Sequence, residues 1–224
     1  MEIASFTLKE LFVLGGVTMW PLLFFSIAAV TISLERAVYL LYHNLRLDDL
    51  AEKVSEYVKN NDYSGAEEYL SALTKRRMGA RILLALIKHS QDGNSFSERR
   101  TERAVETESI NCINSLETGL NFLTALGSIS PLTGFLGTVT GMIGAFRSIA
   151  EATEVNAQIV ANGIYEALIT TVVGLVIAIV AMISHSIISH IVDKFSYKVE
   201  GVCSDLIDQI ATQAECSINA KSSK

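Results

Sequence analysis

Three long blocks of the chain contain no Asp, Glu, Lys or Arg, while the polar and apolar positions elsewhere are mixed. The blocks cover residues 11–34, 118–146 and 167–192. As α-helices rising roughly 1.5 Å per residue, they would reach about 36, 43 and 39 Å, enough to cross a hydrocarbon layer of about 30 Å. The pattern predicts three transmembrane helices and does not fit a water-soluble fold.

Between the first two blocks, apolar positions recur every three or four residues, as is typical of amphipathic helices. The spacing predicts helices over 48–59, 63–75 and 77–89, with turn residues at 60–62 between the first two. These helices should form a helical hairpin beneath the membrane.

The segments next to the second and third spans also read as helices. Ser95 and Glu98 form a capping-box pattern, and the helix that follows meets no breaker before Gly119, so we expect it to run straight into the second span. Beyond the third span an apolar stripe continues at helical spacing. It consists of Val192, Phe195, Val199, Val202, Leu206 and Ile210. The predicted fold class is an all-α membrane protein whose long helices extend into the cytoplasm.

The distribution of Lys and Arg predicts the orientation. Twelve of the 18 lie between the first and second spans, and four follow the third span. Loops rich in Lys and Arg stay on the cytoplasmic side of a membrane. We therefore expect the N-terminus outside and the large loop and C-terminus inside.

The predicted organisation follows from the spans and their orientation. The uncharged residues 155–165 allow the third helix to begin before residue 167. The segments are a periplasmic N-terminus (1–10), transmembrane helix 1 (11–34), a cytoplasmic helical domain (35–117), transmembrane helix 2 (118–146), a periplasmic loop (147–156), transmembrane helix 3 (157–192) and a cytoplasmic C-terminal helix and tail (193–224).

Composition and charge exclude several function classes. The chain is 50% hydrophobic, its mean hydropathy is +0.35 and its net charge is −6. An acidic chain without a basic, aromatic-rich run does not fit nucleic-acid binding. No Ser/His/Asp set, metal-ligand cluster, phosphate-binding loop or pair of carboxylates falls within one element. We therefore expect no enzymatic activity, no metal and no cofactor.

The second and third spans carry small residues at i+3 and i+4 spacing. The candidates for helix packing are Gly134, Gly137 and Gly141 in the second span with Gly174 and Ala178 in the third. Small side chains let helix backbones approach closely in lipid. The stripes fit simple packing within one chain, and their presence in adjacent spans also fits a crowded bundle of several subunits.

Two prolines fall within predicted spans, Pro21 after Trp20 and Pro131 in the second span. Each should weaken the local helix ladder, because proline lacks the N–H and crowds the carbonyl four residues before it. Ser128 and Ser130 are placed to satisfy carbonyls freed by Pro131. Both a structural kink and a functional hinge fit these prolines.

Glu166 is the ionisable residue whose position in the sequence fits a place inside the membrane. If the third helix starts at Ala167, Glu166 sits at the outer interface. If the helix starts near Val155, Glu166 lies about 16 Å along it, at a depth comparable to that of Thr138. A carboxylate inside the membrane costs on the order of 3 kcal/mol unless it is neutralised or hydrated. Such an acid should hold its proton until its surroundings change, as an acid in a proton relay must.

The same region carries a family resemblance. SISPLTGFLGTVTGMIGAF (128–146), followed by VANGIYEALITTVVGLVIAI (160–179), resembles the MotA/TolQ/ExbB proton-channel family. A flagellar MotA would have four spans and a longer chain, so the resemblance favours the ExbB/TolQ branch. It implies that Glu166 is the channel glutamate and that Thr138 and Thr171 line the proton pathway.

The resemblance also implies a role and partners. The chain would be a stator subunit in a bacterial inner membrane, in a homo-oligomer of five copies around ExbD/TolR-like single-span subunits that carry a membrane aspartate. The proton-motive force would then drive an envelope process such as TonB-dependent transport, Tol-type maintenance or gliding, with H⁺ as the transported ion and a TonB- or TolA-like protein as a further partner. The alternative is a passive multi-subunit membrane scaffold that conducts no protons.

Overall fold

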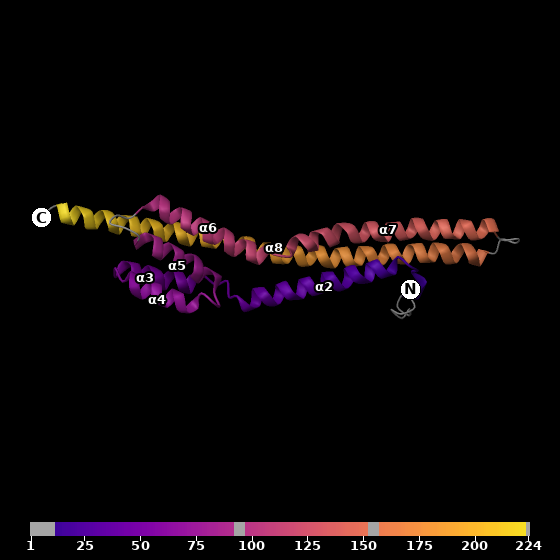
Figure 1. Ribbon diagram of the computed structural model, residues 1–224, viewed down its shortest axis with the longest axis horizontal. Coiled ribbons are helices and arrows are strands. Elements are labelled where there is room, and N and C mark those ends of the chain that lie inside the picture. The colour runs from indigo at the N-terminus through magenta and orange to yellow at the C-terminus, as the bar shows by residue number, and fades with distance from the viewer. Residues whose placement is uncertain (1–11, 92–96, 152–156, 223–224) are drawn as a thin grey trace. The chain divides into compact units, whose positions relative to one another are not determined.

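A computed structural model describes residues 12–91, 97–151 and 157–222, and within these ranges it contains helices and no strand (Figure 1). Three helical segments are long and apolar enough to cross a membrane, within Met19–Tyr42, Glu98–Glu151 and Ala161–Ala214. These findings confirm an all-α membrane protein with three transmembrane helices. The predicted N-terminal segment 1–10 lies outside the described residues.

The chain divides into two compact units, which we describe separately. The membrane unit is Met1–Glu35 with Gly119–Ile187, and the polar unit is Arg36–Thr118 with Ile188–Lys224. The long helices are α2 (Met19–Tyr42), α7 (Leu120–Glu151) and α8 (Ala157–Ser222). Helix α8 has 66 residues and contributes to both units. The predicted loop 147–156 begins inside α7, and its residues 152–156 are not among those described.

The first span differs from its prediction at the outer end. A turn precedes α2, with Gly16 at a φ of +65°, and the helix itself begins only at Met19. Pro21 therefore lies in the first turn, where backbone N–H groups have no acceptor within the helix. The expected weakening of the helix ladder at Trp20–Pro21 is wrong, because no helical hydrogen bond is lost there.

Pro131 lies inside α7, as the second span predicts. It leaves the carbonyl of Gly127 without its helical donor. The hydroxyls of Ser128 and Ser130 donate instead to the carbonyls four residues before each of them, at 3.1 and 2.6 Å. The two serines therefore do not satisfy the carbonyl that Pro131 frees, contrary to the expectation from sequence.

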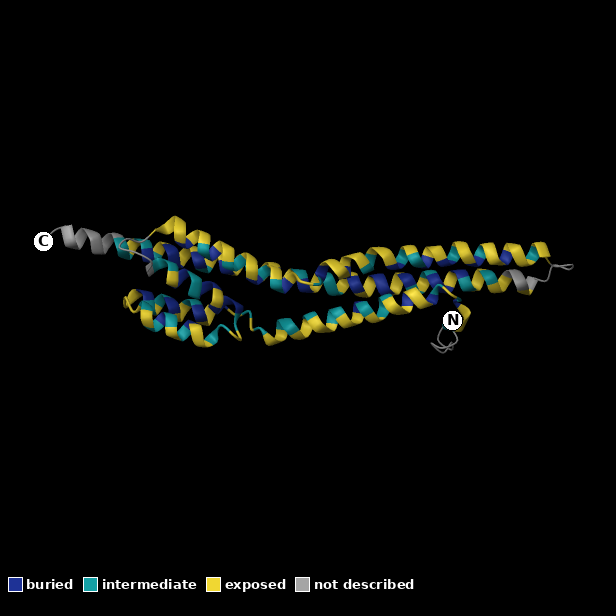
Figure 2. Ribbon diagram, viewed as in Figure 1, coloured by how far each residue is buried: buried dark blue, intermediate teal, exposed yellow. Residues whose placement is uncertain are grey.

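The polar unit contains the predicted helical hairpin. Its helices are α3 (Asp48–Lys59), α4 (Tyr63–Leu73) and α5 (Met78–Gln91). At the turn between α3 and α4, Asn61 has a φ of +56°, and the Asp62 carboxylate caps α4 by accepting from the Gly65 N–H at 3.0 Å. Buried positions recur every four residues along α3 and α4, and most of α5 is buried, which fits the apolar spacing that predicted these helices (Figure 2).

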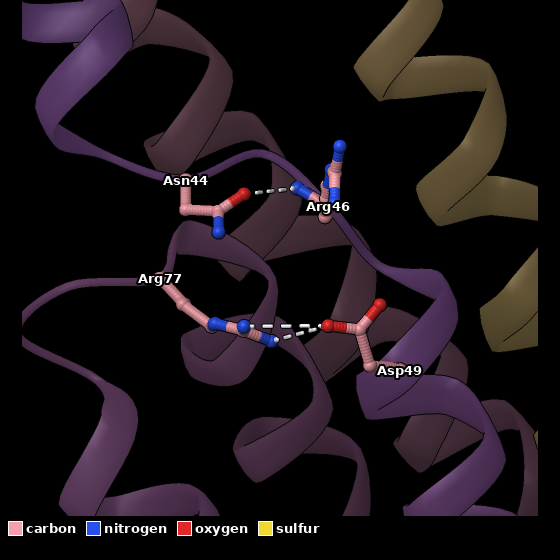
Figure 3. A network of polar contacts seen from close by, with 4 residues as sticks. All are labelled: Asn44, Arg46, Asp49 and Arg77. Carbon is pink, nitrogen blue, oxygen red and sulfur yellow. Dashed lines mark hydrogen bonds and ion pairs between the residues drawn. The ribbon is translucent and has the colours of Figure 1, made fainter.

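An ion pair connects the start of α3 to the start of α5. The two terminal nitrogens of Arg77 donate to Oδ2 of Asp49 at 3.4 and 3.3 Å (Figure 3). Beside it, the Arg46 N–H donates to Oδ1 of Asn44 at 3.1 Å. A backbone hydrogen bond at Asp49 and, to a smaller extent, the Arg77 guanidinium hold the pKa of the Asp49 carboxyl below its ordinary value of 3.8.

Helix α6 (Glu98–Glu117) does not run into α7 without a break. Thr118 has a ψ of 128°, and Gly119 has a φ of +88°, which favours glycine. The expected continuous helix is therefore wrong, and the two units meet along the chain at this break. At the other end Ser97 holds the N-cap position without a side-chain cap, and Ser95 lies outside the described residues.

The apolar stripe predicted beyond the third span lies on the part of α8 that belongs to the polar unit. Five of its six side chains are buried, namely Val192, Phe195, Val199, Leu206 and Ile210. Val202 is half-buried, and Cys203 beside it is buried instead. The stripe therefore packs as its spacing predicts, with one position displaced.

Candidate functional site

In the membrane unit, α7 and α8 pack in opposite directions with their backbones in close contact (Figure 1). A Cβ built on Gly134 would lie 2.8 Å from the Thr170 carbonyl oxygen and 3.1 Å from the Thr171 Cα. A Cβ on Gly174 would lie 2.6 Å from the Ser130 carbonyl oxygen. Side chains larger than hydrogen would therefore force the two backbones apart.

The other predicted packing residues lie along the same contact or are buried. A Cβ on Gly141 would lie 3.2 Å from the Gly163 carbonyl oxygen, and one on Gly137 would overlap the Thr170 hydroxyl. Ala178 is 8% exposed. The small residues of the two spans thus face one another within a single chain.

This register places Glu166. Gly141 of α7 faces Gly163 and Ala167 of α8, so Glu166 is level with Gly141. Helix α8 begins at Ala157, and Glu166 lies about 14 Å along it at roughly 1.5 Å per residue. Of the two helix starts that the sequence left open, the structure therefore has the early one.

Glu166 lines a cavity of about 690 Å³ beside the α7–α8 contact. Its walls come from the N-terminal segment, from α7 and from α8. They are formed by Val13, Leu14, Val17, Thr18, Thr140, Gly141, Gly144, Ala145, Ser148, Asn162, Gly163 and Glu166. The acid is half-buried, and within the described parts of the chain no hydrogen bond or ion pair engages its carboxylate. The cavity is large enough for water, because one water molecule occupies about 30 Å³ of liquid.

The predicted threonines are not joined to Glu166. The Thr138 hydroxyl donates to the Phe135 carbonyl of its own helix at 2.6 Å, and the Thr171 hydroxyl donates across to Gly134 at 3.3 Å. Neither is among the described residues that line the cavity. Thr171 therefore bridges α7 and α8, while Thr138 bonds locally.

Two residues of this site, Thr18 and Asn162, were not predicted from the sequence, whereas Thr140 and Thr170 were considered there as partners for water or for the acid. Thr140 and Asn162 line the cavity, and Asn162 shares a helix face with Glu166 because it lies four residues earlier. Thr18 was missed because its place depends on the turn before α2. Thr170 is fully buried, and its hydroxyl donates to Ala167 at 2.9 Å and to Gly134 at 3.3 Å.

Comparison with known proteins adds an independent finding. The sequence profile of the MotA/TolQ/ExbB proton channel family matches residues 74–201. The biopolymer transport protein ExbB-like 3 of Synechocystis sp. is 32% identical over 171 residues, 75% of this chain and 79% of that protein. Biopolymer transport protein ExbB of Salmonella typhimurium is 31% identical over 143 residues, 62% of this chain and 56% of that protein. The Tol-Pal system protein TolQ of Haemophilus influenzae is 40% identical over 89 residues, 40% of this chain and 39% of that protein.

Proposed function

Because the chain belongs to the MotA/TolQ/ExbB proton channel family, we propose that it is the proton-conducting stator subunit of a bacterial inner-membrane motor. The observation that carries the proposal is the place of Glu166, a carboxylic acid in a cavity about 14 Å along α8. In this role the chain transports H⁺, needs no cofactor and is not an enzyme.

The surroundings of Glu166 suit a group that gains and loses a proton. A carboxylate inside a bilayer costs on the order of 3 kcal/mol, so an acid there is favoured in its neutral form until water or a partner stabilises the charge. Thr18, Thr140 and Asn162 give the cavity a polar lining that can hold such water. Thr138 and Thr171 act indirectly in this proposal, because they hold backbone carbonyls of α7.

A proton relay needs a second acceptor. The acids among the described residues of the membrane unit are Glu35, Glu151 and Glu166. Glu35 lies at the boundary of the unit and Glu151 at the end of α7, so neither is placed beside Glu166 as an acceptor. The acceptor we propose is the membrane aspartate of an ExbD/TolR-like subunit. Moving one proton through 100 mV releases about 2.3 kcal/mol, comparable to the cost of exposing that carboxylate to lipid, so each proton can advance the assembly by one step.

We propose a ring of five copies around these partners, with the N-terminus outside and the C-terminus inside. Beyond their mutual contact, α7 and α8 expose large apolar side chains, including Phe135, Ile143 and Leu168, as surfaces for lipid and for neighbouring copies. The names of the relatives refer to biopolymer transport and the Tol-Pal system. TonB-dependent transport, Tol-type maintenance and gliding are the processes that such a motor would energise, through a TonB- or TolA-like protein in the first two.

The test is Glu166→Gln, which keeps the size of the acid but cannot release a proton. The matched control is Glu151→Gln, since Glu151 is an exposed acid that pairs with Arg147 at 2.9 Å at the end of α7. Each variant is used to complement a strain that lacks the native gene, and complex size is measured by native mass spectrometry. We expect Glu166→Gln to abolish energy-coupled function without changing complex size, and Glu151→Gln to behave as the wild type.

A passive scaffold predicts a different result. In that case the acid needs no titration, and Glu166→Gln would support wild-type function with the partner present. That outcome would refute the proton relay. A monomer or dimer after mild extraction would refute the shared ring.

A further inference from the structure

The turn before α2 has a backbone shape that favours glycine. Gly16 has a φ of +65°, in the left-handed region that residues with a Cβ rarely adopt. The Thr18 hydroxyl donates to the Gly15 carbonyl at 3.3 Å, and the rings of Phe12 and Trp20 meet edge to face with centroids 5.2 Å apart. The hydrogen bond and the ring contact hold the two sides of the turn together.

This turn lies directly against the acid of the candidate site. A Cβ added to Gly16 would overlap Oε1 of Glu166 and would lie 2.9 Å from its Cδ and 3.6 Å from its Cγ. The backbone of Gly16 therefore occupies the space beside the carboxyl group. A side chain at this position and the present placement of the carboxyl group exclude one another.

The turn also closes one side of the cavity. On this side Val13, Leu14 and Val17 are apolar, and Thr18 bears a hydroxyl that donates to the Gly15 carbonyl, whereas α7 and α8 contribute polar groups such as Thr140 and Asn162. Among the described residues that line the cavity, Glu166 is the titratable group. Its carboxyl thus lies beside a mostly apolar cap, in a cavity whose other walls carry polar groups.

We propose that the turn at residues 15–18 caps the Glu166 carboxyl, and that Gly16 is a positioning residue whose backbone lies against this carboxyl and fixes its place in the cavity. The missing side chain of glycine lets the backbone lie against the acid in its present place, and the φ of +65° favours glycine at the same position. The contact stands by itself, while its consequence for proton access rests on the proposed function.

The test compares a glycine-to-alanine change beside the acid with one in the wall of the cavity. Gly16→Ala introduces the overlap with Glu166, whereas Gly144→Ala is the control, because a Cβ on Gly144 would meet nothing within 4 Å. The assembled protein in membrane vesicles is treated with a hydrophobic carbodiimide, which modifies protonated carboxyl groups, and modification at position 166 is followed by mass spectrometry. We expect Gly16→Ala to raise the labelling rate about tenfold, the size of effect typical of residues in contact, and Gly144→Ala to leave it within about twofold.

A second background separates positioning from simple backbone strain. Glu166→Asp shortens the side chain by one methylene and withdraws the carboxyl from the methyl group of Gly16→Ala. In the Glu166→Asp background, Gly16→Ala should therefore change the labelling rate by no more than about twofold. Strain in the turn alone would instead give the same change whether position 166 is Glu or Asp.

The outcomes separate this inference from the proposed function. Equal labelling of Gly16→Ala and Gly144→Ala, or the same change with and without Glu166→Asp, would overturn the cap and leave the channel proposal standing. Wild-type function of Glu166→Gln would overturn the channel proposal and leave the labelling contrast intact.

Discussion

Gly174→Ala should destabilise the membrane unit, although the change adds only a methyl group. The added Cβ would lie 2.6 Å from the Ser130 carbonyl oxygen, 3.2 Å from the Gly134 Cα and 3.3 Å from the Ser130 carbonyl carbon. All three atoms belong to the backbone of α7, so the overlap cannot be relieved by rotating a side chain. Overpacking by a methyl or methylene group typically costs about 1 to 3 kcal/mol.

Helix propensity acts in the opposite direction and must be removed from the comparison. Alanine is favoured over glycine in a helix by about 1 kcal/mol. Gly144→Ala supplies the control, since it makes the same change in α7 where a Cβ meets nothing within 4 Å. The difference in free energy of unfolding between the two variants should therefore be about 1 to 3 kcal/mol, with Gly144→Ala equal to or more stable than the wild type.

The measurement is unfolding of the purified protein in mixed micelles by titration with sodium dodecyl sulfate, at one protein concentration for all chains. Far-UV circular dichroism checks that both variants begin with the same helix content. If Gly174→Ala proved as stable as Gly144→Ala, the close approach of α7 and α8 at this point would be refuted.

Further predictions concern three other contacts. Gly141→Leu should disrupt complex assembly on a native gel more than Val30→Leu, because Gly141 faces the α8 backbone while Val30 is 45% exposed; equal tolerance would contradict this. Thr170→Val should lower the free energy of unfolding by about 1 kcal/mol, because it removes the hydrogen bond from Thr170 of α8 to Gly134 of α7. Thr133→Val is the control, since it removes only a hydrogen bond within α7. Equal losses in the same detergent titration would contradict a stabilising role of the bond between the helices. The folded protein lowers the pKa of Asp49, so the ionised Asp49 contributes to stability above its ordinary pKa of 3.8, and this contribution is lost as the pH falls through the lowered pKa. Asp49→Asn should therefore remove this part of the fall of Tm in acid. The same acid profile of Tm in the variant and the wild type would contradict the prediction.

The local structure could be predicted where one short stretch contains the whole cause. Helices α3 and α4 begin at the predicted residues, Asp48 and Tyr63, because the apolar spacing and the turn at 60–62 act within a few residues of each other. The transmembrane helices were equally clear, since charge-free blocks of this length have few other stable structures. Both signals act through local sequence alone.

The ends and breaks of the long helices depend on more than local pattern. Gly119 was identified as a helix breaker, but whether the chain bends or continues there depends on its φ of +88°, which packing selects. The start of α2 at Met19 instead of near residue 11 likewise follows from the turn at Gly16. A hydropathy pattern does not locate either turn, because it reports how apolar a stretch is and not the backbone angles within it.

Only part of the candidate site could be predicted, because it too depends on contacts between distant parts of the chain. Small-residue stripes indicate that helices can approach, but they do not say which residues meet. The register of α8 against α7 brings Thr170 and Thr171 to Gly134 and leaves Thr138 bonded within its own helix. The cavity around Glu166 depends in addition on the N-terminal segment, which lies far away in sequence.

The close contact of α7 and α8 also limits where a proton can go from Glu166. Backbone atoms meet along this contact from Gly134 and Gly174 to Gly141 and Gly163, so the two helices leave no room for a file of water between them. The cavity lies beside the pair, and Gly16 covers one side of the acid. In the proposed channel a proton on Glu166 must therefore leave through the cavity toward a group supplied by another subunit. This requirement makes the partner's acid part of the conduction path, and it predicts that the chain without its partner conducts no protons.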